Sequence, residues 1–135
     1  MPDFRKVTET LSVSPQITEA DLEAAAAQGF KTIICNRPDG EALGQPKSAA
    51  LKAKAAALGL AYVELPFGGA PTQDIVSRQG AAIDGAEAPV LAFCRSGTRS
   101  ITAWALSRAG GEDPDKVIAA AAEAGYDLSG IRRLL

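Results

Sequence analysis

The strongest constraint on the fold is a repeated alternation of short apolar stretches with longer helix-forming stretches. Three apolar stretches, 31–35, 60–66 and 89–93, carry the composition of buried strands. The segments between them, 46–58 and 72–82, have the length and composition of helices. Strands that alternate with helices in this way form crossover connections and a parallel sheet. We therefore expect an α/β fold with a short central, mostly parallel sheet flanked by helices.

Local signals place the remaining elements. Residues 4–13 alternate loosely and predict a short β-hairpin or an edge pair. Thr18 begins the sequence Thr-Glu-Ala-Asp, which approximates a capping box and predicts a helix that ends before Gly29. Further helices are expected over 100–109, from the Asp113–Pro114 cap to Gly125, and over 127–135.

Length and charge limit the possible classes of protein. A chain of 135 residues is expected to form one domain over residues 1–135, and its net charge of −2 gives no basis for binding nucleic acid or an anionic membrane. The N-terminus lacks the pattern of a secretory signal, and no apolar run approaches the ~18 residues of a membrane span. We therefore expect a cytoplasmic protein, in which two cysteines indicate reactivity or burial rather than a structural disulfide.

The sequence contains no histidine. This excludes Ser–His and Cys–His catalytic pairs and any zinc site that uses histidine, and two isolated cysteines cannot form a four-cysteine site. We expect neither a metal nor a cofactor. Activation of a cysteine in this chain must therefore come from backbone amides and arginines.

The stretch Cys94-Arg95-Ser96-Gly97-Thr98-Arg99-Ser100 lies between the last expected strand and a helix. Backbone amides and the helix dipole converge at such a position and stabilise a thiolate. Gly97 permits a positive φ, which lets amides turn inward, and Arg99 adds a planar fork that suits a tetrahedral oxyanion. The loop predicts a cysteine nucleophile in an anion-binding cradle. The alternative is that Cys94 is a buried and inert cysteine.

This interpretation assigns a role to each residue near the loop. Cys94 is the nucleophile, Arg99 holds the charge of a small anionic substrate, and Ser100 stabilises the thiolate by a hydrogen bond. The candidate substrate-binding or anion-binding residues are Arg95, Ser96, Gly97, Thr98, Arg37 and Asp39.

The cysteine loop resembles the active-site loop of rhodanese sulfurtransferases, in which the cysteine carries a persulfide, and the Cys-x5-Arg loop of cysteine-dependent phosphatases. The chain as a whole resembles the family called beta-lactamase hydrolase-like protein, phosphatase-like domain. Besides the cysteine loop, the resemblance rests on Phe4-Arg5-Lys6, Leu11-Ser12-Val13-Ser14, Asn36-Arg37-Pro38-Asp39-Gly40-Glu41 and Gly69-Ala70-Pro71-Thr72. It implies a protein tyrosine phosphatase-like fold.

The chain departs from the phosphatase pattern at three points. Four residues, not five, separate Cys94 from Arg99, and Phe93 stands where phosphatases of this type usually have histidine. The loop over 66–70 lacks the expected acidic residue, and Asp74 is expected in the first turn of a helix. A missing general acid lowers phosphate-ester cleavage by about 10²–10⁴-fold.

These departures favour one function and leave two others open. Sulfur transfer needs no general acid, so the loop favours a sulfurtransferase that forms a persulfide on Cys94. The alternative is a cysteine-dependent phosphatase that forms a thiophosphate on Cys94, with Asp39 or Asp74 as the acid. The third is a non-catalytic module that binds anions or phosphoproteins.

The other motifs each have two interpretations. The stretch 36–41 either lines the same pocket or forms only a turn, and in the first case Asp39 contacts substrate or supports an arginine. Cys35 either pairs with Cys94 in a protective disulfide or is a small buried apolar residue. Trp104 is expected in the core. Arg132 and Arg133 form a possible contact site, but the sequence identifies no protein partner.

Overall fold

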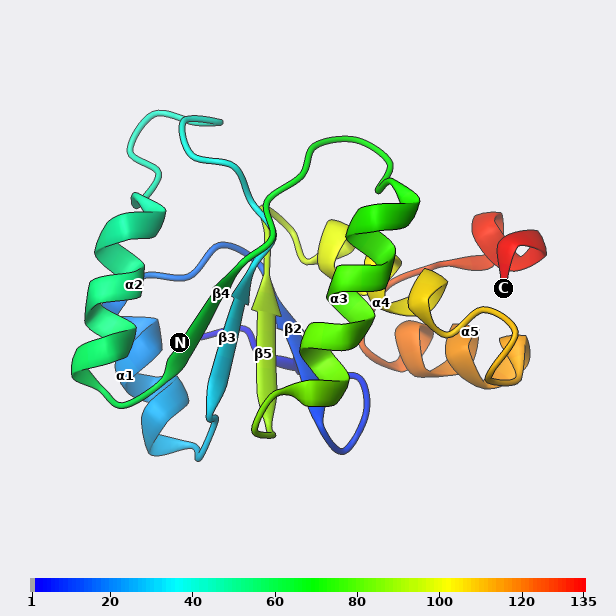
Figure 1. Ribbon diagram of the computed structural model, residues 1–135, viewed down its shortest axis with the longest axis horizontal. Coiled ribbons are helices and arrows are strands. Elements are labelled where there is room, and N and C mark those ends of the chain that lie inside the picture. Colours follow the sequence, from blue (N-terminus) through cyan, green and yellow to red (C-terminus); the bar gives the residue numbers. More distant parts are fainter. Residues whose placement is uncertain (1) are drawn as a thin grey trace.

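The computed structural model describes residues 2–135 and contains one five-stranded sheet. Its strands, in the order β1-β2-β5-β3-β4, are β1 (Arg5–Lys6), β2 (Leu11–Ser14), β5 (Val90–Phe93), β3 (Thr32–Cys35) and β4 (Ala61–Glu64). β1 pairs antiparallel with β2, and every other pairing is parallel. The predicted α/β fold with a mostly parallel sheet is therefore confirmed (Figure 1).

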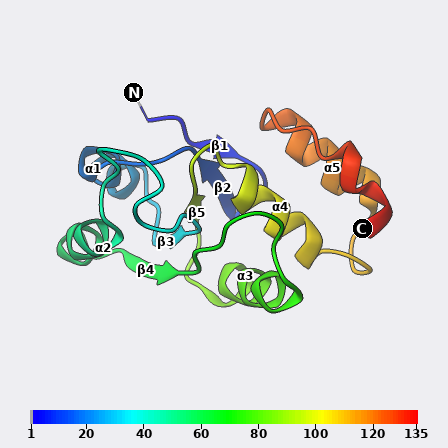
Figure 2. The ribbon, with the colours of Figure 1, turned by 90° about the horizontal axis from the view of Figure 1, so that it is seen from above.

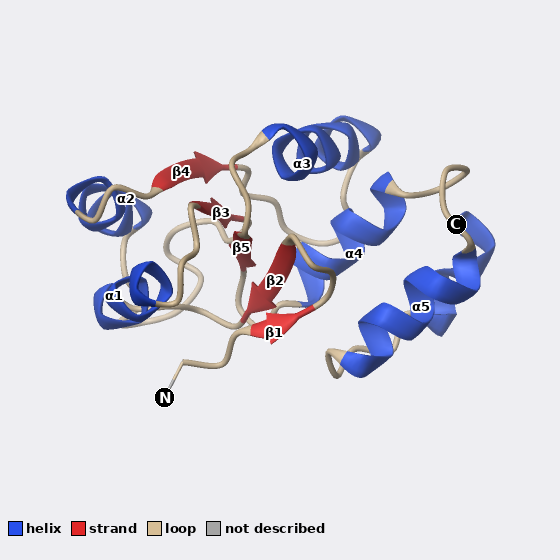
Figure 3. Ribbon diagram, turned by 90° about the horizontal axis from the view of Figure 1, so that it is seen from below, coloured by secondary structure: helices blue, strands red, loops and turns tan. Residues whose placement is uncertain are grey.

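Helices cover both faces of this sheet. Figure 2 shows α1 (Glu19–Ala27) and α2 (Ser48–Ala57) on one face, and α3 (Gln73–Gly85) and α4 (Thr98–Ser107) on the other. The helix α5 (Pro114–Glu123) packs outside α4, as Figure 3 also shows. Each face has its own apolar core, and alternate residues of β5 point into each: Leu91 and Phe93 into the α1–α2 side, Val90 and Ala92 into the other.

Capping residues set the helix starts that the sequence predicts. The Thr18 hydroxyl accepts from the Asp21 N–H at 3.1 Å while the Asp21 carboxylate accepts from the Thr18 N–H at 2.9 Å, which completes the capping box of α1. Thr72 caps α3, and Asp113 followed by Pro114 begins α5. Trp104 is 2% exposed within the core, as expected.

The expected N-terminal hairpin is present, with β1 at the edge of the sheet and β2 between β1 and β5. Two other local predictions need correction. The helix expected over 100–109 begins at Thr98, because the left-handed Gly97 already ends the loop. The expected helix over 127–135 is a 3₁₀ helix, η1 (Ser129–Leu134).

The parallel register brings the ends of the central strands to one level. Cys35, the last residue of β3, pairs with Phe93 of β5, and the Asn36 N–H then donates to the Phe93 carbonyl at 2.9 Å. The segments that follow β3 and β5 therefore leave the same edge of the sheet side by side. Sites in parallel sheets lie at this carboxyl edge.

Residues 2–135 form neither a candidate membrane span nor a candidate metal cluster. None of the helices formed by these residues combines the length and the apolar character that a membrane span requires. The same residues contain no group of three or more His, Cys, Asp or Glu side chains arranged to hold a metal ion.

Candidate active site

Cys94 lies immediately after β5, in a turn that ends at the first residue of α4. The residue is 1% exposed, and its Sγ accepts a hydrogen bond from the Gly97 N–H at 3.1 Å. Gly97 makes this contact with a φ of 95°, in the left-handed region that favours glycine, and it is also the N-cap of α4. A backbone N–H that points at the sulfur favours the thiolate, which is the nucleophilic form of cysteine.

The carbonyls of the loop are bound by groups from outside it. The Arg95 carbonyl accepts from the Gln16 N–H at 3.2 Å, and the Ser96 carbonyl accepts from the Tyr126 hydroxyl at 2.8 Å. Four backbone N–H groups of the loop donate no hydrogen bond to any of the described residues: those of Arg95, Ser96, Arg99 and Ser100. The loop therefore has unpaired backbone donors at a helix N-terminus, where the helix dipole also favours an anion.

Arg99 is held by a carboxylate that sequence reasoning did not select. Its Nη1 donates to Glu41 at 3.0 Å and to the Phe67 carbonyl at 2.8 Å, and its Nη2 donates to Glu41 at 2.8 Å. A guanidinium has five N–H groups in a fixed fork. The Nε–H and the second N–H of Nη2 have no acceptor among residues 2–135, and they lie on one edge of the guanidinium. That edge is the one free to bind an oxyanion with two hydrogen bonds.

Glu41 joins two arginines. Hydrogen bonds from Arg99 and then from Arg37 are the main reasons why the pKa of Glu41 falls from 4.5 to about 2. The hydrogen bonds to Glu41 also raise the pKa of Arg99, although burial acts against this. Glu41 thus holds both arginines in one cluster. Glu41 lies within the predicted 36–41 stretch, four residues after Arg37, and this spacing was the signal available in the sequence.

Arg37 and Asp39 have different surroundings. Arg37 is 5% exposed, and it donates to Glu41 at 2.9 Å and to the side chain of Gln16 at 3.1 Å. The structure therefore brings Arg37 into the same cluster as Arg99. Asp39 instead accepts from the N–H of Ser48 at 2.8 Å, where α2 begins. It caps that helix and supports neither arginine.

Ser100 and Cys35 lie close to the loop without the contacts proposed for them. Ser100 is fully buried, and its hydroxyl has no hydrogen-bond partner among the described residues, so the amide of Gly97 rather than Ser100 contacts the Cys94 sulfur. Cys35 is a free thiol in the α1–α2 core, and its S–H donates to the Arg37 carbonyl at 3.4 Å. Cys94 is also a free thiol in this structure.

The carboxylates near the loop are poorly suited to act as a general acid. Asp74 has a 69% exposed side chain and pairs with Arg78 at 3.1 Å, on its own helix. Glu41, with its pKa near 2, is ionised at neutral pH and has no proton to donate. Residues 66–70 contain no carboxylate at all. The site therefore combines a buried cysteine, unpaired loop amides and Arg99, and neither Asp74 nor Glu41 is in place to protonate a leaving group.

A buried amide pair fixes the end of β3 against the helices. The side chains of Asn36 and Gln79, both fully buried, exchange two hydrogen bonds of 2.9 Å, and Asn36 also donates to the Leu65 carbonyl at 3.0 Å. Gln79 is on α3, so the pair connects the loop after β3 to the opposite layer. The sequence analysis includes Asn36 in the 36–41 stretch but missed Gln79, because their pairing joins positions 43 residues apart in the chain.

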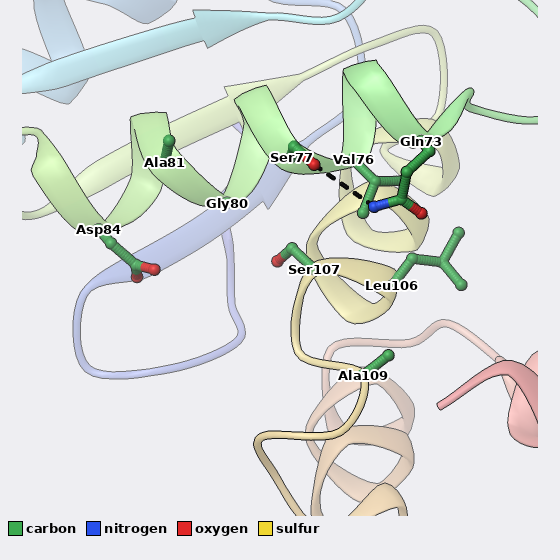
Figure 4. A pocket seen from close by; sticks show the side chains of 9 residues that line it. All are labelled: Gln73, Val76, Ser77, Gly80, Ala81, Asp84, Leu106, Ser107 and Ala109. Atoms are coloured by element: carbon green, nitrogen blue, oxygen red, sulfur yellow. Dashed lines mark hydrogen bonds between the residues drawn. The ribbon is translucent and has the colours of Figure 1, made fainter.

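Two hollows border α4, and Leu106 lines both of them. A hollow of about 560 Å³ lies between α3 and the C-terminal end of α4 (Figure 4). It is lined by Gln73, Val76, Ser77, Gly80, Ala81, Asp84, Leu106, Ser107 and Ala109. A smaller and more apolar hollow of about 260 Å³ borders Arg99 itself. Its walls are Gly69, Ala70, Pro71, Thr98, Thr102, Leu106, Ile131 and Leu134.

The sheet and its helices are arranged as in proteins with a protein tyrosine phosphatase-like fold. One such protein, a kinase-associated phosphatase, superposes with a TM-score of 0.68 at 15% identity, over 98% of this chain and 89% of that one. The chain belongs to the family described as beta-lactamase hydrolase-like protein, phosphatase-like domain, which matches residues 3–111. The resemblance inferred from the sequence is therefore confirmed.

Individual relatives agree with this assignment. The crystal structure of a candidate phosphatase from Neisseria meningitidis is 39% identical, with a TM-score of 0.88 over 99% of this chain and 97% of that one. A beta-lactamase hydrolase-like protein of Agrobacterium fabrum is 41% identical over 107 residues, which are 77% of this chain and 24% of the relative. One of Xylella fastidiosa is 36% identical over 125 residues, 90% of this chain and 29% of the relative. The chain thus spans about a quarter of the length of these curated relatives.

Proposed function

We propose that this chain, as a single phosphatase-like domain over residues 1–135, is a cysteine-dependent phosphatase that cleaves phosphate monoesters with good leaving groups. The observation that carries the proposal is the free edge of Arg99 beside Cys94 and the unpaired amides of its loop. The phosphatase-like family and its phosphatase relatives support phosphate chemistry better than the sulfur transfer that the loop spacing favours. Residues 94–100 therefore act on a small phosphate-containing substrate.

The reaction proceeds in two displacements. The Cys94 thiolate attacks phosphorus, the S–P bond forms, and the ester P–O bond breaks, with its electron pair leaving on the alcohol or phenol oxygen. Water then attacks phosphorus, which releases inorganic phosphate and returns the electron pair to the sulfur. The loop amides and the free edge of Arg99 stabilise the phosphoryl oxygens in both steps.

The lack of a positioned acid decides which esters react. A leaving oxygen that receives no proton must carry its own negative charge, so phenolates with electron-withdrawing groups leave far more readily than alkoxides. General acid catalysis contributes about 10²–10⁴-fold in rate, which is the disadvantage expected for poor leaving groups. The substrate class is thus activated esters, aryl phosphates above all.

The apolar hollow beside Arg99 fits such a substrate. A cavity of about 150 Å³ is enough to hold a benzene molecule. The hollow at Arg99 has about 260 Å³ and is bordered by Thr98 of the loop, so an aryl group has room next to the phosphoryl site. Ile131 and Leu134 bring the C-terminal segment into contact with this group.

A series of aryl phosphates of graded leaving-group acidity tests the proposal. We expect release of phosphate that requires Cys94, with kcat/KM falling steeply from dinitrophenyl through nitrophenyl to phenyl phosphate. Cys35→Ser serves as the matched control, since it alters the other buried cysteine. If even the most activated ester gives no turnover that depends on Cys94, the phosphatase proposal is wrong. A flat dependence on leaving group would instead reveal an acid and refute the restriction to activated esters.

Sulfur transfer is the second candidate, and one observation favours it: Cys94 and Arg99 are separated by four residues, as in the rhodanese-like loop. In that reaction the Cys94 thiolate attacks the outer sulfur of thiosulfate, a new S–S bond forms, and sulfite leaves with the electrons of the old one. No proton donor is needed. Intact-mass spectrometry after incubation with thiosulfate gives the test. A gain of one sulfur atom, absent in Cys94→Ser, supports this candidate, and an unchanged mass rejects it.

A non-catalytic anion-binding module is the third interpretation. If neither reaction occurs but inorganic phosphate raises the unfolding temperature, then anion binding alone explains the arrangement of the 94–100 loop. Loss of that stabilisation in Arg99→Lys would assign the binding to this site.

A further inference from the structure

Tyr126 contacts the cysteine loop from a distant part of the chain. It follows α5, beyond residues 3–111, and its side chain is almost fully buried, with the residue 8% exposed. Its hydroxyl donates a hydrogen bond of 2.8 Å to the Ser96 carbonyl. The contact joins residues separated by 30 positions, and no sequence motif predicts it.

The Ser96 carbonyl and the Gly97 N–H belong to one peptide group. Such a group is planar and trans, so its C=O and N–H point in opposite directions. Tyr126 holds the oxygen end of this group, and the nitrogen end donates to the Cys94 sulfur at 3.1 Å. Fixing the carbonyl therefore fixes the direction of the N–H that contacts the nucleophile.

The absence of a side chain at Gly97 makes room for this contact. A Cβ at Gly97 would lie 2.1 Å from the Tyr126 hydroxyl oxygen, far inside van der Waals contact. The tyrosine hydroxyl thus fills the space beside Gly97 while it binds the preceding carbonyl. A flipped peptide would turn the N–H away from sulfur and aim a carbonyl at it, which disfavours the thiolate.

The N-terminal strand keeps Tyr126 in place. The Arg5 guanidinium stacks over the tyrosine ring, with its central carbon 5.1 Å from the ring centroid, and Arg5 also donates to the Ala124 carbonyl at 3.5 Å. Burial raises the pKa of Tyr126, although the charge of Arg5 acts against this, so the hydroxyl remains a donor at neutral pH.

We propose that Tyr126 is a positioning residue for the nucleophile: its hydroxyl fixes the Ser96–Gly97 peptide with the N–H directed at Cys94. The proposal rests on the proposed function only in treating Cys94 as a nucleophile. The thiol reactivity of Cys94 is measurable without any substrate, so it tests the positioning role separately from the phosphatase reaction.

The test compares two tyrosine-to-phenylalanine variants. Tyr126→Phe removes the hydroxyl and keeps the ring. Tyr62→Phe removes the other tyrosine hydroxyl, which forms a hydrogen bond of 2.8 Å with the Ser48 hydroxyl and not with the cysteine loop. The readout is the rate at which iodoacetamide alkylates Cys94, measured at several pH values from neutral to alkaline. Peptide mapping identifies the alkylated cysteine. We expect Tyr126→Phe to be slower at neutral pH by roughly 3- to 10-fold, the value of one hydrogen bond. The rates should converge at alkaline pH, and Tyr62→Phe should match the wild type.

Turnover provides a second readout. In Tyr126→Phe we expect kcat for an aryl phosphate to fall with the alkylation rate, while KM changes by less than about twofold, because Glu41 still holds Arg99. Arg5→Gln, which removes the stacked cation, should shift both rates in the same direction by a smaller factor, and it serves if Tyr126→Phe fails to fold.

Three results would decide the matter against the positioning role. Equal Cys94 alkylation rates in the wild type and Tyr126→Phe would overturn it, even if the protein hydrolyses phosphate. An equal loss in Tyr62→Phe would show a general effect of stability and also overturn it. A loss of kcat that persists at alkaline pH, where alkylation rates agree, would refute the link through the thiol. Slower alkylation in a protein without phosphatase activity would support the positioning role and reject only the proposed function.

Discussion

The two cysteines of this chain lie at the ends of neighbouring parallel strands and have opposite hydrogen bonds. Cys35 ends β3, Cys94 follows the neighbouring parallel β5, and both are buried at the carboxyl edge of the sheet. The Cys35 sulfur donates to a backbone carbonyl at 3.4 Å, whereas the Cys94 sulfur accepts from a backbone N–H at 3.1 Å. A carbonyl favours the protonated thiol and an N–H favours the thiolate. Burial alone therefore does not distinguish the two cysteines, and under the proposed function the direction of one hydrogen bond separates the nucleophile from the other thiol.

The loops that follow the two cysteines differ in the same way. The loop after Cys94 is organised by its backbone, with a left-handed Gly97 and amides left unpaired at a helix N-terminus. The loop after Cys35 is organised by side chains, and its Glu41 holds Arg99 in place. Under the proposed function, one loop binds the anion and the other orients the arginine that assists it.

The largest expected effect separates the two thiols. Cys94→Ser should reduce turnover of an activated aryl phosphate by about 10⁴-fold or more, since the nucleophile is removed. Cys35→Ser should retain turnover within about threefold, because this sulfur contacts only a carbonyl. Steady-state release of nitrophenol measures both, and similar losses in the two variants would erase the distinction.

The next effect concerns the fork of Arg99. Arg99→Lys keeps the positive charge but loses the paired donors, so kcat/KM should fall by about 10²–10³-fold, as when an oxyanion donor is removed. Arg78→Lys on α3 is the matched control, since Arg78 pairs only with exposed Asp74. An unchanged kcat/KM in Arg99→Lys would mean that charge alone suffices and that the free edge has no role.

The loop after Cys35 should be sensitive to the loss of one buried side chain. Gln79→Leu leaves the Asn36 amide without its main partner and should lower the free energy of unfolding by about 1–3 kcal/mol. Gln73→Leu on the same helix is the control, because Gln73 is exposed and bonds only Ser77 at 3.3 Å. Urea unfolding measures the two, and equal stabilities would show that the amide pair does not fix this loop.

The smallest effect is a pH dependence at Glu41. Its pKa is about 2 in the folded protein and 4.5 ordinarily, so the ionised carboxylate stabilises the fold above about pH 4.5. This contribution should decline as the pH falls from there toward 2, where the carboxylate takes up a proton. The stability difference between the wild type and Glu41→Gln should therefore be constant near neutral pH and shrink below pH 4.5. Urea titrations at several pH values provide the measurement, and a difference that grows on acidification would contradict the assignment.

Much of the fold follows from local sequence signals. Alternating strands and helices predict the parallel sheet, and Thr18, Thr72 and Asp113 mark helix starts that the structure confirms. The place of β2 inside the sheet could not be predicted, because it depends on a pairing with β5 nearly 80 residues away. Strand order is a property of long-range contacts, and periodicity does not encode it.

The residues of the candidate site also fall into two groups, those with a local sequence signal and those that only long-range contacts place. Cys94, Gly97 and Arg99 form one contiguous stretch whose chemistry is visible in the sequence. Glu41 and Tyr126 act on that stretch from 58 and 30 residues away, so only folding reveals them. Asp39 looked suitable as a carboxylate beside an arginine, but its oxygen satisfies an N–H at the start of α2 instead.

The most direct test of the account is to find where the phosphoryl group resides during turnover. The protein is mixed with dinitrophenyl phosphate, quenched in acid within the first turnover, and mapped by peptide mass spectrometry. The account predicts a phosphoryl group on the peptide that contains Cys94 and none on the peptide that contains Cys35. A phosphoryl group on Cys35, or on neither cysteine while phosphate is still released in a rapid burst, would contradict it.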